Sequence, residues 1–210
     1  MSRLLWLVVW FSFIGYALWL APGARSGDDP LFMDLVTLQS NEASLMAMFS
    51  LLGLFPVAFA CLLLRSDNGN VPAWPFSLAA FGLGAFALIP YYILKRDQDL
   101  TYRQSRAPHW VLKLARSGVF LVLLMLGTLA VIGYGLFMGD LQAYGEAFSS
   151  SQFVHVMSID FIILVLLSVY GIYRDPKRQP YSAMIACLGM LPIVGLLIYL
   201  WLTRHRVNTA

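Results

Sequence analysis

Charged residues are scarce in this sequence: Asp, Glu, Lys and Arg make up 12% of its 210 residues, about half the share found in soluble domains. Intrinsic disorder is excluded as well, because disordered chains are poor in aromatic residues, whereas Phe, Trp and Tyr make up 14% of this chain. Apolar residues reach 60%, and the mean hydropathy is +0.73. This composition indicates an integral membrane protein whose main partner is the lipid bilayer.

Cysteine is also scarce, and the two that occur, Cys61 and Cys187, belong to no CxxC or Cys/His motif. Their spacing predicts neither a disulfide framework nor a zinc site. The sequence has no basic arm of the kind that binds nucleic acid. It also has no nucleophile–base set, phosphate-binding loop or HExxH motif. We therefore expect a protein that is not an enzyme and that has no cofactor, no metal and no nucleic-acid partner.

Six apolar windows are each long enough to cross the roughly 30 Å hydrocarbon core of a bilayer as a helix. They lack the two-residue alternation of a membrane β-barrel, and backbone groups in lipid must form hydrogen bonds within their own segment. Asp160 is the only charged residue inside a window. The sequence predicts an all-α fold, with residues 1–210 as one integral membrane domain. This domain is a polytopic transmembrane helix bundle with six spans, at about 4–22, 43–64, 74–94, 117–138, 152–173 and 182–203.

The positions of Lys and Arg predict how this bundle is oriented. If all six windows cross, ten of these residues lie in the first, third and fifth connections, and four lie on the opposite side. Lys and Arg concentrate in cytoplasmic loops, so we expect both termini on the non-cytoplasmic face. The first window, which precedes APGA at 21–24, has a cleaved signal peptide as a second interpretation. Its length and its three tryptophans favour a lasting helix.

Asp160 is the most informative candidate for a functional residue. It lies about 12 Å from the start of the fifth window, at 1.5 Å per residue. An ionised carboxylate facing lipid there costs about 2.5–3.5 kcal/mol, so Asp160 is expected to face the bundle. It either handles a proton or a ligand, or it forms an interhelical hydrogen bond. No second charge in the windows could relay a proton, which favours the hydrogen bond, with expected partners Ser12, Tyr16, Ser77 or Tyr134.

His155 and Ser158 lie in the same stretch, FVHVMSIDF at 153–161. Five residues at 100° each separate His155 from Asp160 by about 140° around a helix, so the two do not share a face. Ser158 stacks on His155 one turn along. An interfacial hydrogen bond is the expected role of His155, and ligation of a haem or pigment is the alternative.

Prolines interrupt three of the windows, at Pro56, Pro90 and Pro192. Each removes a backbone hydrogen bond, and we expect a helix kink at each position. Glycines cluster near them, as in AAFGLGAFA at 79–87. Small residues beside kinks occur in gates and cavities, but tight helix packing also uses them and is the favoured interpretation.

Two stretches, PAWPFSLAAFGLGAFALIPYYILKR at 72–96 and SSSQFVHVMSIDFIILVLL at 149–167, resemble a family of uncharacterised multi-pass membrane proteins, a domain of unknown function from cyanobacteria and plastids. FIGYALWLAP at 13–22 and MFSLLGLFPVAFACLLL at 48–64 fit the same pattern. The resemblance implies a membrane protein of a photosynthetic organism, in the thylakoid, plasma or plastid membrane. It implies no activity. A bacterial inner membrane is the alternative location.

Three functions are compatible with these observations. The first is an accessory, assembly or scaffold role beside a larger membrane protein complex, which fits the short connections and the small number of buried charges. The second is a small-solute or proton-linked transporter that uses Asp160 and the proline-containing helices. The third is a pigment or haem binder that uses His155.

Overall fold

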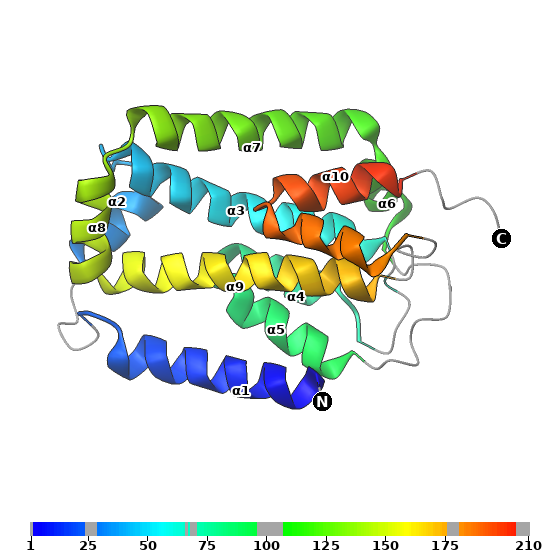
Figure 1. Ribbon diagram of the computed structural model, residues 1–210, viewed down its shortest axis with the longest axis horizontal. Helices are drawn as coiled ribbons and strands as arrows, with labels where there is room; N and C mark the ends of the chain where they lie inside the picture. The colour runs from blue at the N-terminus through cyan, green and yellow to red at the C-terminus, as the bar shows by residue number, and fades with distance from the viewer. Residues whose placement is uncertain are drawn as a thin grey trace.

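The computed structural model of the protein describes residues 2–23, 29–65, 67, 71–95, 107–175 and 181–204. Every regular element in these ranges is a helix, and no β-strand occurs among them, so the predicted all-α fold is confirmed. The long helices lie side by side in one elongated bundle, with shorter helices at both ends (Figure 1).

Four helices are long and apolar enough to cross a bilayer, which indicates a membrane protein. Helix α3, for example, has 22 residues, about 33 Å at 1.5 Å per residue, and therefore matches the thickness of the hydrocarbon core. The four coincide with the predicted windows at 4–22, 43–64, 117–138 and 152–173. They are α1 (Ser2–Gly15, continued by a π-helical turn at Tyr16–Leu20), α3 (Ala43–Leu64), α7 (Gly118–Met138) and α9 (Gln152–Arg174).

The predicted third span is two short helices that fold back on each other. These are α4 (Trp74–Leu83) and α5 (Ala85–Leu94), joined at Gly84. The ring of Phe76, near the start of α4, lies 5.7 Å from the ring of Tyr91, near the end of α5. The prediction of one continuous helix at 74–94 is therefore wrong. Each limb has ten residues, about 15 Å, and so extends through only half of a bilayer.

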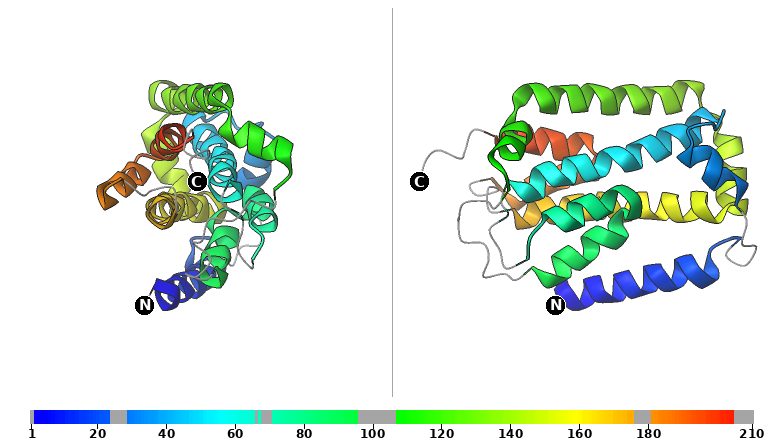
Figure 2. Two further views of the ribbon diagram at one scale, coloured as in Figure 1. Left: turned by 90° about the vertical axis from the view of Figure 1, so that its right-hand side faces the viewer. Right: turned by 180° about the vertical axis from the view of Figure 1, so that it is seen from behind.

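Contacts with α1 fix the direction of this hairpin. The Trp10 indole donates a hydrogen bond to the Phe86 carbonyl, and the Arg3 guanidinium donates one to the Lys95 carbonyl, each at 3.0 Å. α5 thus runs antiparallel to α1. Both limbs of the hairpin start and finish at the end of the bundle where α1 begins, and the tip points into its middle (Figure 2).

The predicted sixth span is also broken. A 3₁₀ helix at Ala183–Met190 runs beside α9, and Gly189 lies so close to the backbone of Val169 that it has no room for a side chain. After a turn in which Ile193 has a φ of 58°, α10 (Val194–Leu202) returns toward the same end of the bundle (Figure 1). The six-span prediction is therefore not confirmed: four windows are single long helices and two are hairpins.

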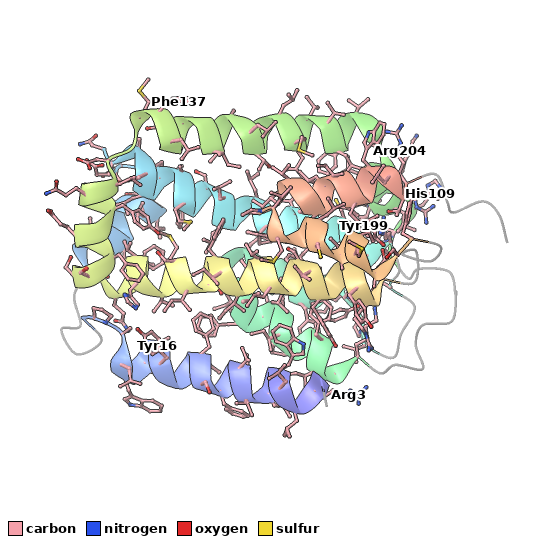
Figure 3. All side chains as sticks on the ribbon, in the orientation of Figure 1. Arg3, Tyr16, His109, Phe137, Tyr199 and Arg204 are labelled. Carbon is pink, nitrogen blue, oxygen red and sulfur yellow. The ribbon has the colours of Figure 1, made fainter. Side chains whose placement is uncertain are left out.

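Charge divides the two ends of the bundle, where short helices cover the long ones. α6 (His109–Arg116) lies at one end, and α2 (Pro30–Val36) and α8 (Leu141–Ser150) lie at the other. We call the first the basic end, because it carries every described Lys and Arg: Arg3, Arg65, Lys95, Lys113, Arg116, Arg174 and Arg204. The second is the acidic end, which carries Asp29, Asp34, Glu42, Asp140 and Glu146. Figure 3 shows Arg3 and Arg204 at the basic end, far from Phe137 near the acidic end.

The expected orientation assumed that the connections alternate between six crossings. The hairpin at 74–94 removes that alternation, because it returns the chain to the end at which α1 starts. The N-terminal end of α1 therefore lies with Lys95 and Lys113 rather than opposite them. The Lys and Arg count behind the expected orientation therefore no longer applies, and the orientation itself stays a prediction.

α3 and α9 form the centre of the bundle, and about half of their residues are buried. α1 and α7 lie on the outside, with 17% of their apolar windows buried. Their exposed side chains are large and apolar along the whole helix, and Phe137 on α7 is 87% exposed. Apolar surface of this extent is typical of contact with lipid.

Candidate functional site

Gly84 forms the tip of the α4–α5 hairpin, in the middle of the bundle. Its φ of 52° and ψ of −126° are a backbone conformation that residues with a side chain rarely adopt. A Cβ atom at this position would lie 2.9 Å from Oδ1 of Asp160 and closer still to Oδ2. Glycine is needed here both for the turn and for the close approach of the carboxylate.

Asp160 on α9 faces this tip and is 4% exposed. Its Oδ1 accepts a hydrogen bond of 2.8 Å from the N–H of Ala85, the first residue of α5. The first N–H groups of a helix lack partners within the helix and carry a partial positive charge, so the carboxylate caps α5. The expected interhelical bond is present, but its donor is a backbone amide and not one of the predicted hydroxyls. Oδ2 accepts no hydrogen bond from any residue that the structure describes.

A cavity of about 390 Å³ adjoins Asp160 between α3, α4, α5 and α9. Asp160 is the only charged residue that lines it. The rest of its lining is apolar and includes four phenylalanine rings, from Phe49, Phe81, Phe86 and Phe153. The site is thus an aromatic chamber with a single carboxyl group at the tip of a broken helix.

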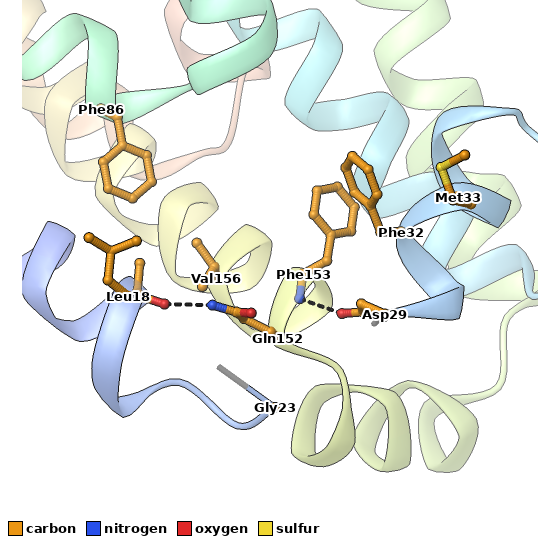
Figure 4. Close-up of a pocket in the computed structure, with 10 residues that line it drawn as sticks. Leu18, Gly23, Asp29, Phe32, Met33, Phe86, Gln152, Phe153 and Val156 are labelled. Carbon is orange, nitrogen blue, oxygen red and sulfur yellow. Dashed lines mark hydrogen bonds between the residues drawn. The ribbon is translucent and has the colours of Figure 1, made fainter. Parts of the chain in front are cut away.

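A second cavity, of about 680 Å³, lies nearer the acidic end, and Figure 4 shows the residues that line it. The two cavities share Phe86, Phe153 and Val156 in their linings. At the outer end of the second cavity, Oδ2 of Asp29 accepts a 2.9 Å hydrogen bond from the N–H of Phe153, and the Gln152 amide donates one of 2.8 Å to the Ala17 carbonyl. The two cavities are therefore neighbours along α9.

His155 lies near the start of α9, and both of its ring nitrogens are hydrogen-bonded within the chain. Nε2 is 2.7 Å from the Tyr16 hydroxyl, and Nδ1 is 2.8 Å from the Phe148 carbonyl. A carbonyl only accepts, so Nδ1 carries the proton, and in the neutral ring Nε2 accepts from Tyr16. Coordination of a haem or pigment by His155 would require one of these bonds to break. His155 contacts α1 and α8, whereas Asp160 contacts α5, in line with their expected separation around the helix.

Ser158 also faces α8, where its hydroxyl is hydrogen-bonded to that of Tyr144. Tyr144 is half-buried, and burial raises the pKa of its hydroxyl. These contacts join α8 to α9 at the acidic end. Neither His155 nor Ser158 lines the two cavities, so of the three polar candidates from the sequence only Asp160 belongs to the site.

The three proline candidates have different surroundings. Pro56 lies inside α3 and Pro90 inside α5, and both helices continue through them. Pro192 lies in the turn that precedes α10. The break that shapes the site is at Gly84, six residues before Pro90, and not at a proline.

A buried polar cluster at the basic end was not predicted from the sequence. Arg65, which follows α3, forms an ion pair with Asp175, which follows α9. Arg65 also donates a 2.7 Å hydrogen bond to the Thr203 hydroxyl, and Tyr199 on α10 donates one of 2.8 Å to Asp175. Arg65 and Asp175 stand just outside apolar windows, where each resembles an ordinary loop charge. The sequence could have indicated this ion pair only through the opposite charges of the two residues, which follow neighbouring helices.

The described residues contain no group of three or more His, Cys, Asp or Glu side chains that could hold a metal ion. Comparison of the chain with protein-family models, with curated proteins and with solved structures finds no match. The resemblance to the cyanobacterial and plastid family thus stays a prediction.

Proposed function

We propose that the protein is a proton-linked membrane carrier for small organic cations, with Asp160 as the group that binds both the cation and the proton. The observation that carries this proposal is the position of Asp160. Its carboxyl group lies in the middle of the bundle, at the first residue of a half-length helix, beside a cavity that has a second cavity next to it toward the acidic end. Carriers commonly bind their substrates near the bilayer midplane, where helices are broken.

The chemistry of the chamber favours a cationic substrate of moderate size. The faces of aromatic rings attract cations, and the chamber has four phenylalanines and one carboxyl group. Asp29, the acidic residue that lines the second cavity, attracts cations toward it. An ionised Asp160 without a cation is costly at this depth. A proton and an organic cation each remove that cost. Because both bind the same carboxyl group, binding of the cation releases the proton, and the carrier exchanges one for the other.

The charge distribution supports a specific placement in the membrane. The four long helices cross the bilayer, and the two hairpins enter from the basic end and turn back at mid-depth. Because Lys and Arg concentrate in the cytoplasm, the basic end is cytoplasmic and the cavities open to the opposite side. The buried Arg65–Asp175 ion pair joins the ends of α3 and α9 at the basic end. The family resemblance adds a photosynthetic membrane as the proposed location.

Transport in proteoliposomes tests this proposal. A panel of amines and quaternary ammonium ions is added outside vesicles that contain a pH-sensitive dye. Exchange predicts that at least one cation alkalinises the lumen as it enters and a proton leaves. Asp160→Asn keeps an oxygen that can accept the Ala85 hydrogen bond but cannot release a proton, so we expect this exchange to be abolished.

Asp34→Asn is the matched control, because it makes the same substitution on an exposed residue of α2 that lines neither cavity. We expect its exchange rate to equal that of the wild type. Exchange that persists in Asp160→Asn, or a folded wild type that exchanges no cation of the panel, would contradict the proposal. The accessory role considered from the sequence makes a different prediction, namely that the protein co-purifies with a larger complex in mild detergent.

A further inference from the structure

A groove at the basic end, on the opposite side of α3 from the carrier site, joins two arginines to an apolar channel. Its outer part, of about 560 Å³, lies between α7 and α10 and is lined by Arg116, Arg204, Gly118 and apolar side chains. An adjoining part of about 390 Å³ is lined only by apolar residues. The two parts share Val122 and Trp201.

The two arginines meet the groove from different elements. Nε of Arg116, at the end of α6, is buried and has no hydrogen-bond partner among the described residues. The guanidinium of Arg204 lies 4.1 Å from the centre of the Trp201 ring. It also occupies the space where Gly118 lacks a side chain, since a Cβ there would collide with one of its nitrogens. The described residues that line this groove include two arginines and no acidic side chain.

The surroundings place these charges at the depth of lipid headgroups. α6 is amphipathic, and its Trp110 is 69% exposed while Lys113 points outward. Tryptophan and lysine in such a helix are typical of the membrane–water interface. From there the groove follows α7 inward from Val119 to Leu126, about 11 Å along the helix axis.

We propose that this groove binds an anionic phospholipid, with its phosphate between Arg116 and Arg204 and one acyl chain along α7 and α10. Guanidinium groups suit phosphate because their N–H groups can bind two of its oxygens at once. Basic pockets between membrane helices on the cytoplasmic side bind anionic headgroups, and the basic end is the side proposed to be cytoplasmic. The apolar channel favours a lipid over free phosphate, because free phosphate has no acyl chain to bind there.

Native mass spectrometry of the full-length protein tests this inference with two lipids of identical acyl chains, phosphatidylglycerol and phosphatidylcholine. We expect phosphatidylglycerol to bind about tenfold more tightly, because a choline cation offsets the phosphate charge in phosphatidylcholine and not in phosphatidylglycerol. Arg116→Gln and Arg204→Gln should each remove this preference. Lys113→Gln is the matched control, because it removes one positive charge from the same helix outside the groove.

Val122→Trp tests the acyl channel, because Val122 lines both parts of the groove and the indole would fill it. We expect this variant to lose phosphatidylglycerol while it keeps the two arginines. Equal binding of the two lipids by the wild type would overturn the inference, as would an equal loss in Lys113→Gln. Unchanged binding in Val122→Trp, or displacement of the lipid by millimolar inorganic phosphate, would also overturn it, because either result means that the acyl chain is not bound. None of these readouts depends on transport.

Discussion

The backbone of Gly84 lies directly against the carboxylate of Asp160, so the tip of one half-length helix pair and the middle of α9 fit together only when residue 84 has no side chain. The same contact lets the N–H of Ala85 reach the carboxylate. The break in the helix and the buried acid thus form a single structural unit, and the proposed carrier site depends on both.

We predict that Gly84→Ala destabilises the protein by about 2–4 kcal/mol, since it combines backbone strain with a collision in the core. Thermal unfolding in detergent measures this effect. Gly82→Ala is the control, because Gly82 lies in α4 and a Cβ there meets no atom within 4 Å. Its stability should equal or slightly exceed that of the wild type. Similar losses in both variants would show that the contact with Asp160 is not the cause.

The ion pair at the basic end predicts a large effect of Asp175→Asn. This change leaves the charge of Arg65, which is 5% exposed, buried without its counter-charge, and we expect a loss of about 3–5 kcal/mol. Tyr199→Phe removes only a hydrogen bond to the same carboxylate and should cost about 1 kcal/mol. Denaturant titration of both variants separates the two contributions. Equal losses would mean that the ion pair contributes no more than a neutral hydrogen bond.

Tyr16→Phe should cost about 1–3 kcal/mol, because it leaves Nε2 of the buried His155 without a donor. Tyr134→Phe on α7 is the matched control, since that side chain is 48% exposed, and we expect no change there. Nitrogen NMR of labelled histidine gives a second measurement: in the wild type, Nδ1 of His155 should carry the proton. A proton on Nε2 instead would contradict the assigned hydrogen bonds.

Tyr144 predicts a pH dependence of stability. Burial raises the pKa of its hydroxyl in the folded protein, so above about pH 10 the folded state keeps a proton that the unfolded chain releases. The stabilisation is fully present below that pH and is lost as the pH rises through the raised pKa. Tyr144→Phe should therefore show a shallower fall of unfolding free energy above pH 10 than the wild type. Identical slopes for the wild type and Tyr144→Phe would refute this role of Tyr144.

The buried acid was found from the sequence, but its partner was not. A charged residue inside an apolar window must face other protein groups, and Asp160 does so at 4% exposure. The expected hydroxyl donors were side chains, because these are visible in a sequence. The actual donor, the N–H of Ala85, exists only because α5 starts there. Likewise, the glycines at 79–87 were assigned to ordinary packing, whereas Gly84 ends one helix and begins another.

Hydropathy by itself predicted a helical membrane protein, and it located the four long helices, because a backbone in lipid must form its hydrogen bonds within each segment. It could not determine how many times the chain crosses. A window of about 20 apolar residues is equally compatible with one full-length helix or with two half-length helices that reverse direction. Only the tertiary structure decided this, because the reversal at Gly84 depends on a carboxylate from α9 that caps the second helix. That distant contact also decided which charges share an end, and hence the proposed orientation.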